Sequence, residues 1–229
     1  MKARKSVIVI VEGLSDETLM SYFLPKIYDP SFVRVHVYHG DITTDRQSTP
    51  GSIIRQVNMC IKYEMKLYGL RKTDVLRAIH VMDTDGAFVP DEAVKESADV
   101  PHALYSCTEI TTNDRESILA RNQQKRANMT RLATTHAIGG IPYLPVYMSC
   151  NLDHVLHDKQ NNDDDAKGTD AQNFVLRYND DVPGFVRFMC ESDFSVAGDR
   201  DESWDFIAEG LHSLERHTNF GLCVKGDQP

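Results

Sequence analysis

The stretch Ser6-Val-Ile-Val-Ile-Val11, followed directly by Glu12-Gly13, is the part of the sequence that decides the fold. Its continuous β-branched run predicts a strand that is buried on both faces, as strands of parallel sheets are. Ser15 is suited to cap a helix, and apolar side chains then recur at helical spacing over residues 19–27. The chain therefore begins with a strand–turn–helix unit.

The rest of the first 150 residues repeats this alternation. Further strands are expected at residues 33–38, 77–82, 103–107 and 143–148, and helices at 52–68 and 115–136. A β–α–β–α order implies a mainly parallel sheet with right-handed crossovers, flanked by helices. The expected fold class is therefore α/β.

The final third of the chain has a different pattern. Residues 161–170 are polar and acidic, which predicts a solvated loop. Short helices are expected at 172–178, 182–191 and 203–217. Trp204, in the last of them, is expected to lie in the core. We interpret residues 1–160 as one domain and residues 161–229 as a helical C-terminal extension packed on it.

The composition limits the classes of protein to consider. Among the 229 residues, 41% are hydrophobic and 26% charged, the balance of a globular protein. The formal net charge of −9 argues against a passive nucleic-acid coat protein. It does not exclude an enzyme that acts on nucleic acid, because metal ions and a local basic patch can replace a basic surface.

The sequence also indicates where the protein works. No run of 18 apolar residues is present, and the apolar run at residues 7–11 is too short for the core of a signal peptide. We therefore expect a cytoplasmic protein without a membrane partner. Five scattered cysteines without a CxxC pair predict reduced thiols rather than a zinc site.

Acidic residues follow two of the predicted strands. Glu12 ends the first strand, and Asp83 and Asp85 lie at the end of the strand at 77–82. Residues two apart in an extended chain point to the same side, and open parallel sheets bind ligands beyond the carboxyl ends of their strands. If the two strands are near neighbours, the three carboxylates converge, and a divalent cation such as Mg²⁺ or Mn²⁺ would neutralise them.

The acidic residues also have purely structural interpretations. Acids after strands also serve as turn formers and helix caps. Asp16 either stabilises the N-terminus of its helix or reaches the site.

Phosphate-loop, dinucleotide-binding, zinc-protease and serine-hydrolase motifs (GxxxxGKS/T, GxGxxG, HExxH, GxSxG) are all absent from the sequence.

The stretches VIVIVEGLSDE (Val7–Glu17) and IHVMDTDG (Ile79–Gly86) resemble the two signatures of the Toprim fold. That fold is the metal-binding catalytic domain of topoisomerases, bacterial primases and overcoming-lysogenization-defect (OLD) nucleases. The residues after Glu-Gly are most similar to the nuclease branch. The resemblance implies that Glu12 is a general acid/base or a metal ligand, and that Asp83 and Asp85 are metal ligands.

A second segment, Ser149–His157 (SCNLDHVLH), is similar to an element of small standalone RloB-like Toprim defence proteins. By this resemblance Asp153 replaces a glutamate and His157 keeps the family's histidine. Many Toprim domains carry a third acid soon after the Asp-x-Asp pair. The candidates here are Asp91, Glu92 and Asp153.

Two further groups of residues are candidates for the site. Residues 115–131 hold five basic residues and one acid, a net charge of +4 in an acidic protein. Arg121 and Lys125, one turn apart, either belong to a solvated helix face or contact a substrate backbone. His154 and His157 share a helix face, but without HExxH-type partners they do not predict zinc; His157 is a candidate phosphate contact or proton donor.

These observations and the resemblance predict a Mg²⁺- or Mn²⁺-dependent nuclease that hydrolyses phosphodiester bonds in DNA or RNA. The resemblance further implies a role in bacterial antiphage defence and control by a separate ATPase or sensor subunit. Two alternatives stay open: a catalytically degenerate interaction module, and a nucleotidyl or phosphoryl transferase acting on a small nucleotide. The sequence leaves open DNA or RNA, one metal or two, and whether the chain forms a homo-oligomer.

Overall fold

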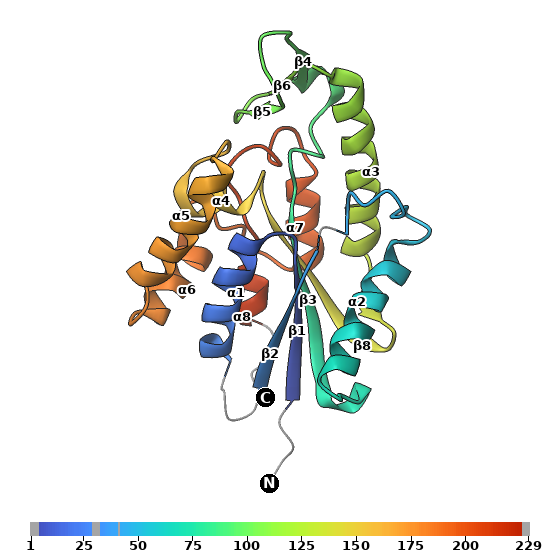
Figure 1. Cartoon of the computed structure of the whole chain (residues 1–229), viewed down its shortest axis with the longest axis vertical. Helices are drawn as coiled ribbons and strands as arrows, with labels where there is room; N and C mark the ends of the chain where they lie inside the picture. The colour runs from blue at the N-terminus through green and yellow to red at the C-terminus, as the bar shows by residue number, and fades with distance from the viewer. Residues whose placement is uncertain (1–4, 29–32, 41, 226–229) are drawn as a thin grey trace.

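A five-stranded sheet forms the centre of the computed structural model, which describes residues 5–28, 33–40 and 42–225 (Figure 1). Its order is β2-β1-β3-β8-β7. The strands are β1 (Lys5–Val11), β2 (Val33–His39), β3 (Val75–Asp83), β7 (Ala137–Ile138) and β8 (Ile141–Met148). Strands β2, β1, β3 and β8 are parallel, and β7 is antiparallel to β8. The predicted α/β class is confirmed, with a sheet that is mixed at one edge.

The sequence of β1 explains why helices cover both faces of this sheet. Val7, Val9 and Val11 point into one core and Ile8 and Ile10 into the other, and all five are fully buried. A central strand with apolar residues at every position is stable only between two apolar layers.

The helices form these two layers (Figure 1). The first face packs against α1 (Leu14–Ile27), α4 (Leu152–His157), α5 (Asp164–Arg177), α6 (Val182–Glu191) and α8 (Gly221–Lys225). The second packs against α2 (Ile53–Leu67), α3 (Arg115–Ala133) and α7 (Arg200–Ile207). Among the described residues, no helix combines the length and apolar composition needed to span a membrane.

The C-terminal third contributes to both layers, since α5, α6 and α8 lie on one face and α7 on the other. Trp204 is buried in α7 with its ring edge-on to Tyr147, as predicted. The predicted loop at 161–170 is wrong in part, because α5 begins at Asp164 and packs Ala171 and Phe174 into the protein. The predicted helix at 203–217 is also too long, and ends at Ile207.

A second, three-stranded sheet lies above the carboxyl ends of the main strands (Figure 1). It has the order β4-β6-β5, from β4 (Val94–Glu96), β5 (Leu104–Tyr105) and β6 (Ile110–Thr112). The strand predicted at 103–107 therefore forms, but it is only two residues long and belongs to this second sheet rather than to the main one. Short 3-10 turns, η1 (Lys72–Asp74) and η2 (Asp91–Ala93), precede β3 and β4.

Candidate functional site

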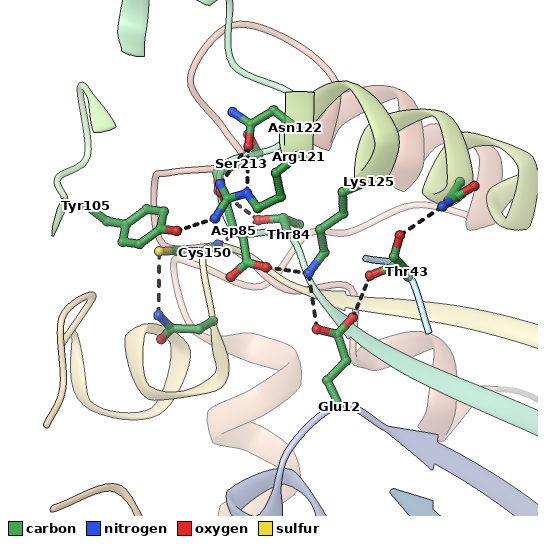
Figure 2. A network of polar contacts seen from close by, with 12 residues as sticks. Glu12, Thr43, Thr84, Asp85, Tyr105, Arg121, Asn122, Lys125, Cys150 and Ser213 are labelled. Carbon is green, nitrogen blue, oxygen red and sulfur yellow. Dashed lines mark hydrogen bonds and ion pairs between the residues drawn. The ribbon is translucent and has the colours of Figure 1, made fainter. Parts of the chain in front are cut away.

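The two acidic motifs meet at the carboxyl ends of neighbouring strands. β1 pairs with β3 in parallel, so Glu12 after β1 and Asp85 after β3 approach the same point. Figure 2 shows both carboxylates on the ammonium of Lys125 from α3. The Glu12 Oε2 to Lys125 Nζ distance is 3.1 Å, and Asp85 Oδ2 accepts from the same nitrogen. The condition set by the sequence, that the two strands be neighbours, is met.

Asp83 is the last residue of β3 and the least compensated of these acids. Its Oδ1 is buried and, among the described residues, has no hydrogen-bond donor. Burial raises the pKa of this carboxyl well above its ordinary value, and the charges of Asp16, Glu12 and Asp85 raise it further. Lys125 acts in the opposite direction. The site therefore holds more negative charge than its cations neutralise.

Asp16 belongs to the same cluster as well as to the first turn of α1. It is buried, and burial raises its pKa to about 7, with hydrogen bonds from the backbone of Asp16 and Gly13 opposing that rise. The charge of Asp153 raises the pKa further. A Cβ at position 13 would lie 3.1 Å from Asp16 Oδ2, so Gly13 leaves room for this carboxylate. Asp16 therefore lies in the first turn of α1 and also within reach of the other carboxylates.

Asp153 lies with the other acids, whereas Asp91 and Glu92 do not. Asp153 is in the first turn of α4, is buried, and lines a hollow together with Asp16 and Asp83. Burial raises its pKa. Asp91 and Glu92 are exposed on η2 and line neither hollow of the site.

A cleft opens over these carboxylates. It consists of two hollows of about 670 and 460 Å³ that share Asp83, Asn151 and Lys167. The larger is also lined by Asp85, His102, Ala103, Leu104, Tyr105, Gln160, Asn161, Asn162 and Asp163. Lys167 brings a positive charge to both hollows, and amide side chains are the most frequent polar groups that line the larger one. This lining suits a polar ligand, and it suits an anionic one only with a cation bound at the acids, because Asp83, Asp85 and Asp163 outnumber Lys167.

The backbone at the floor of the cleft is unusual. Asp85 (φ 48°) and Cys150 (φ 54°) adopt left-handed conformations, and the Asp85 N–H donates to the Cys150 carbonyl at 2.8 Å. Gly86 also has positive φ, and a Cβ there would lie 2.6 Å from Leu214 Cδ2. Non-glycine residues in sparsely populated conformations concentrate at functional sites, where surrounding contacts hold them.

Arg121 and Lys125 are not on a solvated helix face. Lys125 is completely buried between Glu12 and Asp85. Arg121 donates from Nη2 to the Asp85 carbonyl at 2.9 Å and from Nη1 to the Tyr105 hydroxyl (Figure 2). Lys125 therefore offsets the negative charges of Glu12 and Asp85 inside the protein. Arg121 fixes the turn that carries Asp85.

The sequence interpretation missed the supporting role of Thr43 and Asn128. Thr43 Oγ1 donates to Glu12 Oε1 at 3.1 Å, and Asn128 Nδ2 donates to the Thr43 carbonyl at 2.8 Å. The sequence shows Asn122, Lys125 and Asn128 recurring every three residues in α3, but only the fold reveals that they belong to its buried face. A buried polar stripe on a helix indicates a polar partner underneath.

His157 is not brought to the cleft. Its ring lies edge-on against Phe174, with centroids 5.5 Å apart, and it lines neither hollow. Burial lowers its pKa, which favours the neutral ring. His154 lies beside Asp158, 3.5 Å from Nε2 to Oδ1, rather than beside His157 in a shared metal site.

The donor set fits a hard divalent cation in chemistry and in charge. Asp83 has an unsatisfied oxygen, and the neighbouring donors are all carboxylates, which Mg²⁺ and Mn²⁺ prefer. Within the described residues, no three acidic, histidine or cysteine side chains already surround a single metal position. Metal binding by Glu12, Asp83 and Asp85 together would therefore require their carboxylates to lie closer to one another than they do here.

Comparisons of the chain with protein-family models, with curated proteins and with solved structures gave no match.

Proposed function

We propose that this protein is a Mg²⁺- or Mn²⁺-dependent phosphodiesterase acting on a nucleic acid. The observation that carries the proposal is the buried, donor-free Oδ1 of Asp83 among the carboxylates of Glu12, Asp16 and Asp85. These acids lie at the carboxyl edge of a parallel sheet, below an open polar cleft. A cluster of this kind is costly unless a cation binds it, which favours a functional role over that of turn formers.

Each residue has a role in the proposed reaction. Asp83 and Asp85 would hold the cation, with Asp16 and Asp153 near enough to support them and Glu12 as a further ligand or the general base. When bound, the cation would supply Lewis-acid activation of the phosphate and a lower pKa for a water. Lys167, which lines both hollows, would attract the phosphate, and Lys125 limits the repulsion among the acids.

The motif resemblance to the nuclease branch of the Toprim fold supports this proposal, because it assigns catalytic roles to Glu12, Asp83 and Asp85. The parallel order β2-β1-β3-β8 is compatible with that resemblance. On the same basis we propose a setting in antiphage defence under a separate ATPase or sensor subunit. Full, unregulated activity of the chain alone would count against that control.

A cleavage assay tests the proposal. Plasmid, single-stranded DNA and total tRNA would be incubated with the protein in Mn²⁺, Mg²⁺ or EDTA. Asp83→Asn and the exposed-acid control Glu92→Gln would be run in parallel. We expect metal-dependent cutting by the wild type and by Glu92→Gln, and a loss of at least about a hundredfold in Asp83→Asn. Metal-dependent cleavage retained by the double variant Asp83→Asn with Asp85→Asn would contradict the proposal.

One observation favours a second candidate, a binding module without catalysis. Lys125 already pairs with Glu12 and Asp85, so the cluster is partly neutralised without a metal. On this alternative, millimolar Mn²⁺ would give no thermal stabilisation, because nothing would bind the native state selectively. A transferase acting on a small nucleotide would instead form a nucleotide product with no cut polymer.

A further inference from the structure

Helix α2 carries a positive and partly aromatic surface in an otherwise acidic protein. Residues 42–72 include six basic and two acidic residues, a net charge of +4 against −9 for the whole chain, although Arg71 among them pairs with Asp74 just beyond this range. One of the two acids, Glu64, is buried. The basic side chains Arg55, Lys62 and Lys66 are exposed along α2. This charge pattern complements a polyanion.

Large side chains interleave with these cations. Four large apolar or aromatic side chains of this region are more than half exposed to solvent: Met59 (58%), Tyr63 (57%), Leu67 (57%) and Tyr68 (52%). The Tyr68 ring also lies 4.0 Å from the ring of His36 on β2. Exposed rings between cations are the surface on which unpaired bases stack while their phosphates meet the charges.

A hollow of about 580 Å³ opens beside this face, between α2 and the segment before it. Tyr63 and Met59 supply a ring and a flexible apolar wall, and Gln47 and Gln56 supply amides that can hydrogen-bond to base edges. The hollow has room for a base that has left the stack. A base that is paired and stacked inside a duplex has no free face to stack on the Tyr63 ring.

The hollow adjoins the candidate active site. Asp45 and Ser48 line it, while Thr43 in the same segment donates to Glu12. Gln124 from α3 fixes this segment by donating to the carbonyls of Asp45 and Ser48 at 2.8 and 2.9 Å. One short, anchored segment therefore lines the hollow and also contacts Glu12, so a chain seated on α2 would lie close to the acidic cluster.

We propose that the α2 face, defined as Arg55, Met59, Lys62, Tyr63, Lys66 and Leu67, binds single-stranded nucleic acid and leads it toward the cleft. This inference deepens the proposed function and rests on it for the direction of the strand. The binding itself does not require the acids.

Fluorescence anisotropy of the full chain in EDTA tests the inference without cleavage. The probes are labelled DNA and RNA oligonucleotides of about 12 nucleotides, single-stranded and as duplexes. We expect tighter binding of the single strands and a Kd raised roughly fivefold or more by Tyr63→Ala. The pair Lys62→Glu with Lys66→Glu should lower the slope of log K against log salt by about 1.4.

A matched control makes the same charge change on the opposite layer, Arg177→Glu with Arg187→Glu in α5 and α6. It should bind like the wild type, and circular dichroism would confirm that all variants are folded. Equal binding of duplex and single strand, no effect of Tyr63→Ala, or binding to phosphatidylserine vesicles in place of oligonucleotides would overturn the inference.

The two proposals fail separately. Metal-dependent cleavage with unaltered oligonucleotide binding in the α2 variants would leave the nuclease and remove this face. Binding that depends on Tyr63 and Lys62, without any metal-dependent cleavage, would leave the face and remove the nuclease.

Discussion

Individual carboxyl groups at the cleft reduce the stability of the metal-free protein, because burial and neighbouring negative charges disfavour their ionised form. Asp16 is buried and Asp83 is half-buried with a buried Oδ1, and the pKa values of both carboxyl groups are raised above the ordinary value of an aspartate. Natural proteins retain such groups where function requires them, since folding alone would favour their removal. The pH dependence of stability and the removal of Lys125 each test this cost.

The metal-free protein should become more stable as the pH falls from 8.5 to 6.5. The pKa of Asp16 is about 7 in the folded state, above that of an unfolded aspartate, so the folded state binds the proton more tightly and gains stability on acidification. In EDTA, the difference in Tm between wild type and Asp16→Asn should narrow across this window. Below pH 6.5, buried His154 and half-buried His157 and His217, whose pKa values are lowered, will act in the opposite direction. A constant difference across the window would contradict the prediction.

Replacing Lys125 by methionine should destabilise the metal-free protein by roughly 3 kcal/mol, because Glu12 and Asp85 lose a buried cation. Mn²⁺ should restore more stability to Lys125→Met than to the wild type, since a bound cation replaces the lost charge. Urea unfolding with and without Mn²⁺ measures both effects. The exposed-lysine control Lys95→Met should change stability by less than about 0.5 kcal/mol. No greater rescue of Lys125→Met would argue against a metal at this position.

At the scale of elements, the position of α3 controls the site, because that helix carries both Arg121 and Lys125. The end of α3 is held by Arg200 from α7, whose guanidinium donates to the carbonyls of Leu132, Ala133, Thr135 and Tyr143. This side chain satisfies carbonyls that a helix C-terminus leaves without donors.

We therefore expect Arg200→Met to cost about 2 kcal/mol of unfolding free energy, measured by urea denaturation. Arg131→Met, near the same end of α3 but exposed, should cost less than about 0.5 kcal/mol. Equal effects of the two substitutions would show that Arg200 does not anchor the helix.

The elements also show what the sequence can and cannot predict. The strands β1, β2, β3 and β8 follow from apolar runs, and the meeting of Glu12 with Asp85 follows from their parallel pairing. The burial of Lys125 does not, since a polar helix face normally indicates solvent and only the fold puts acids beneath it. Likewise α5 begins eight residues before its predicted start, because the helix that buries Ala171 and Phe174 extends back through polar residues that the local composition assigns to a loop.

At the scale of the whole molecule, the C-terminal third is part of the core. Phe185 of α6 is fully buried, and its ring stacks on Phe23 of α1 with centroids 3.7 Å apart. The ring of Phe220 lies edge-on to the ring of Phe185. One apolar cluster therefore joins residues of the first helix to residues near the end of the described chain.

Phe185→Ala should lower the unfolding free energy by about 3–5 kcal/mol, since it removes a ring from a packed core. Leu176→Ala on the exposed side of α5, where the side chain is 69% exposed, should have an effect near zero. Urea denaturation monitored by circular dichroism compares the two. A cost below about 1 kcal/mol for Phe185→Ala would show that the C-terminal helices are only loosely attached.

The account as a whole depends on whether the acids around Asp83 form a cation site. The most direct measurement is the Tm of wild type, Asp83→Asn and Glu92→Gln in EDTA and in increasing Mn²⁺. Removing one buried charge should make Asp83→Asn more stable than the wild type in EDTA. Saturating Mn²⁺ should then raise the Tm of wild type and Glu92→Gln by roughly 5–10 °C and leave Asp83→Asn unchanged. Equal Mn²⁺ shifts in all three proteins, or an Asp83→Asn variant that is less stable in EDTA, would contradict the account.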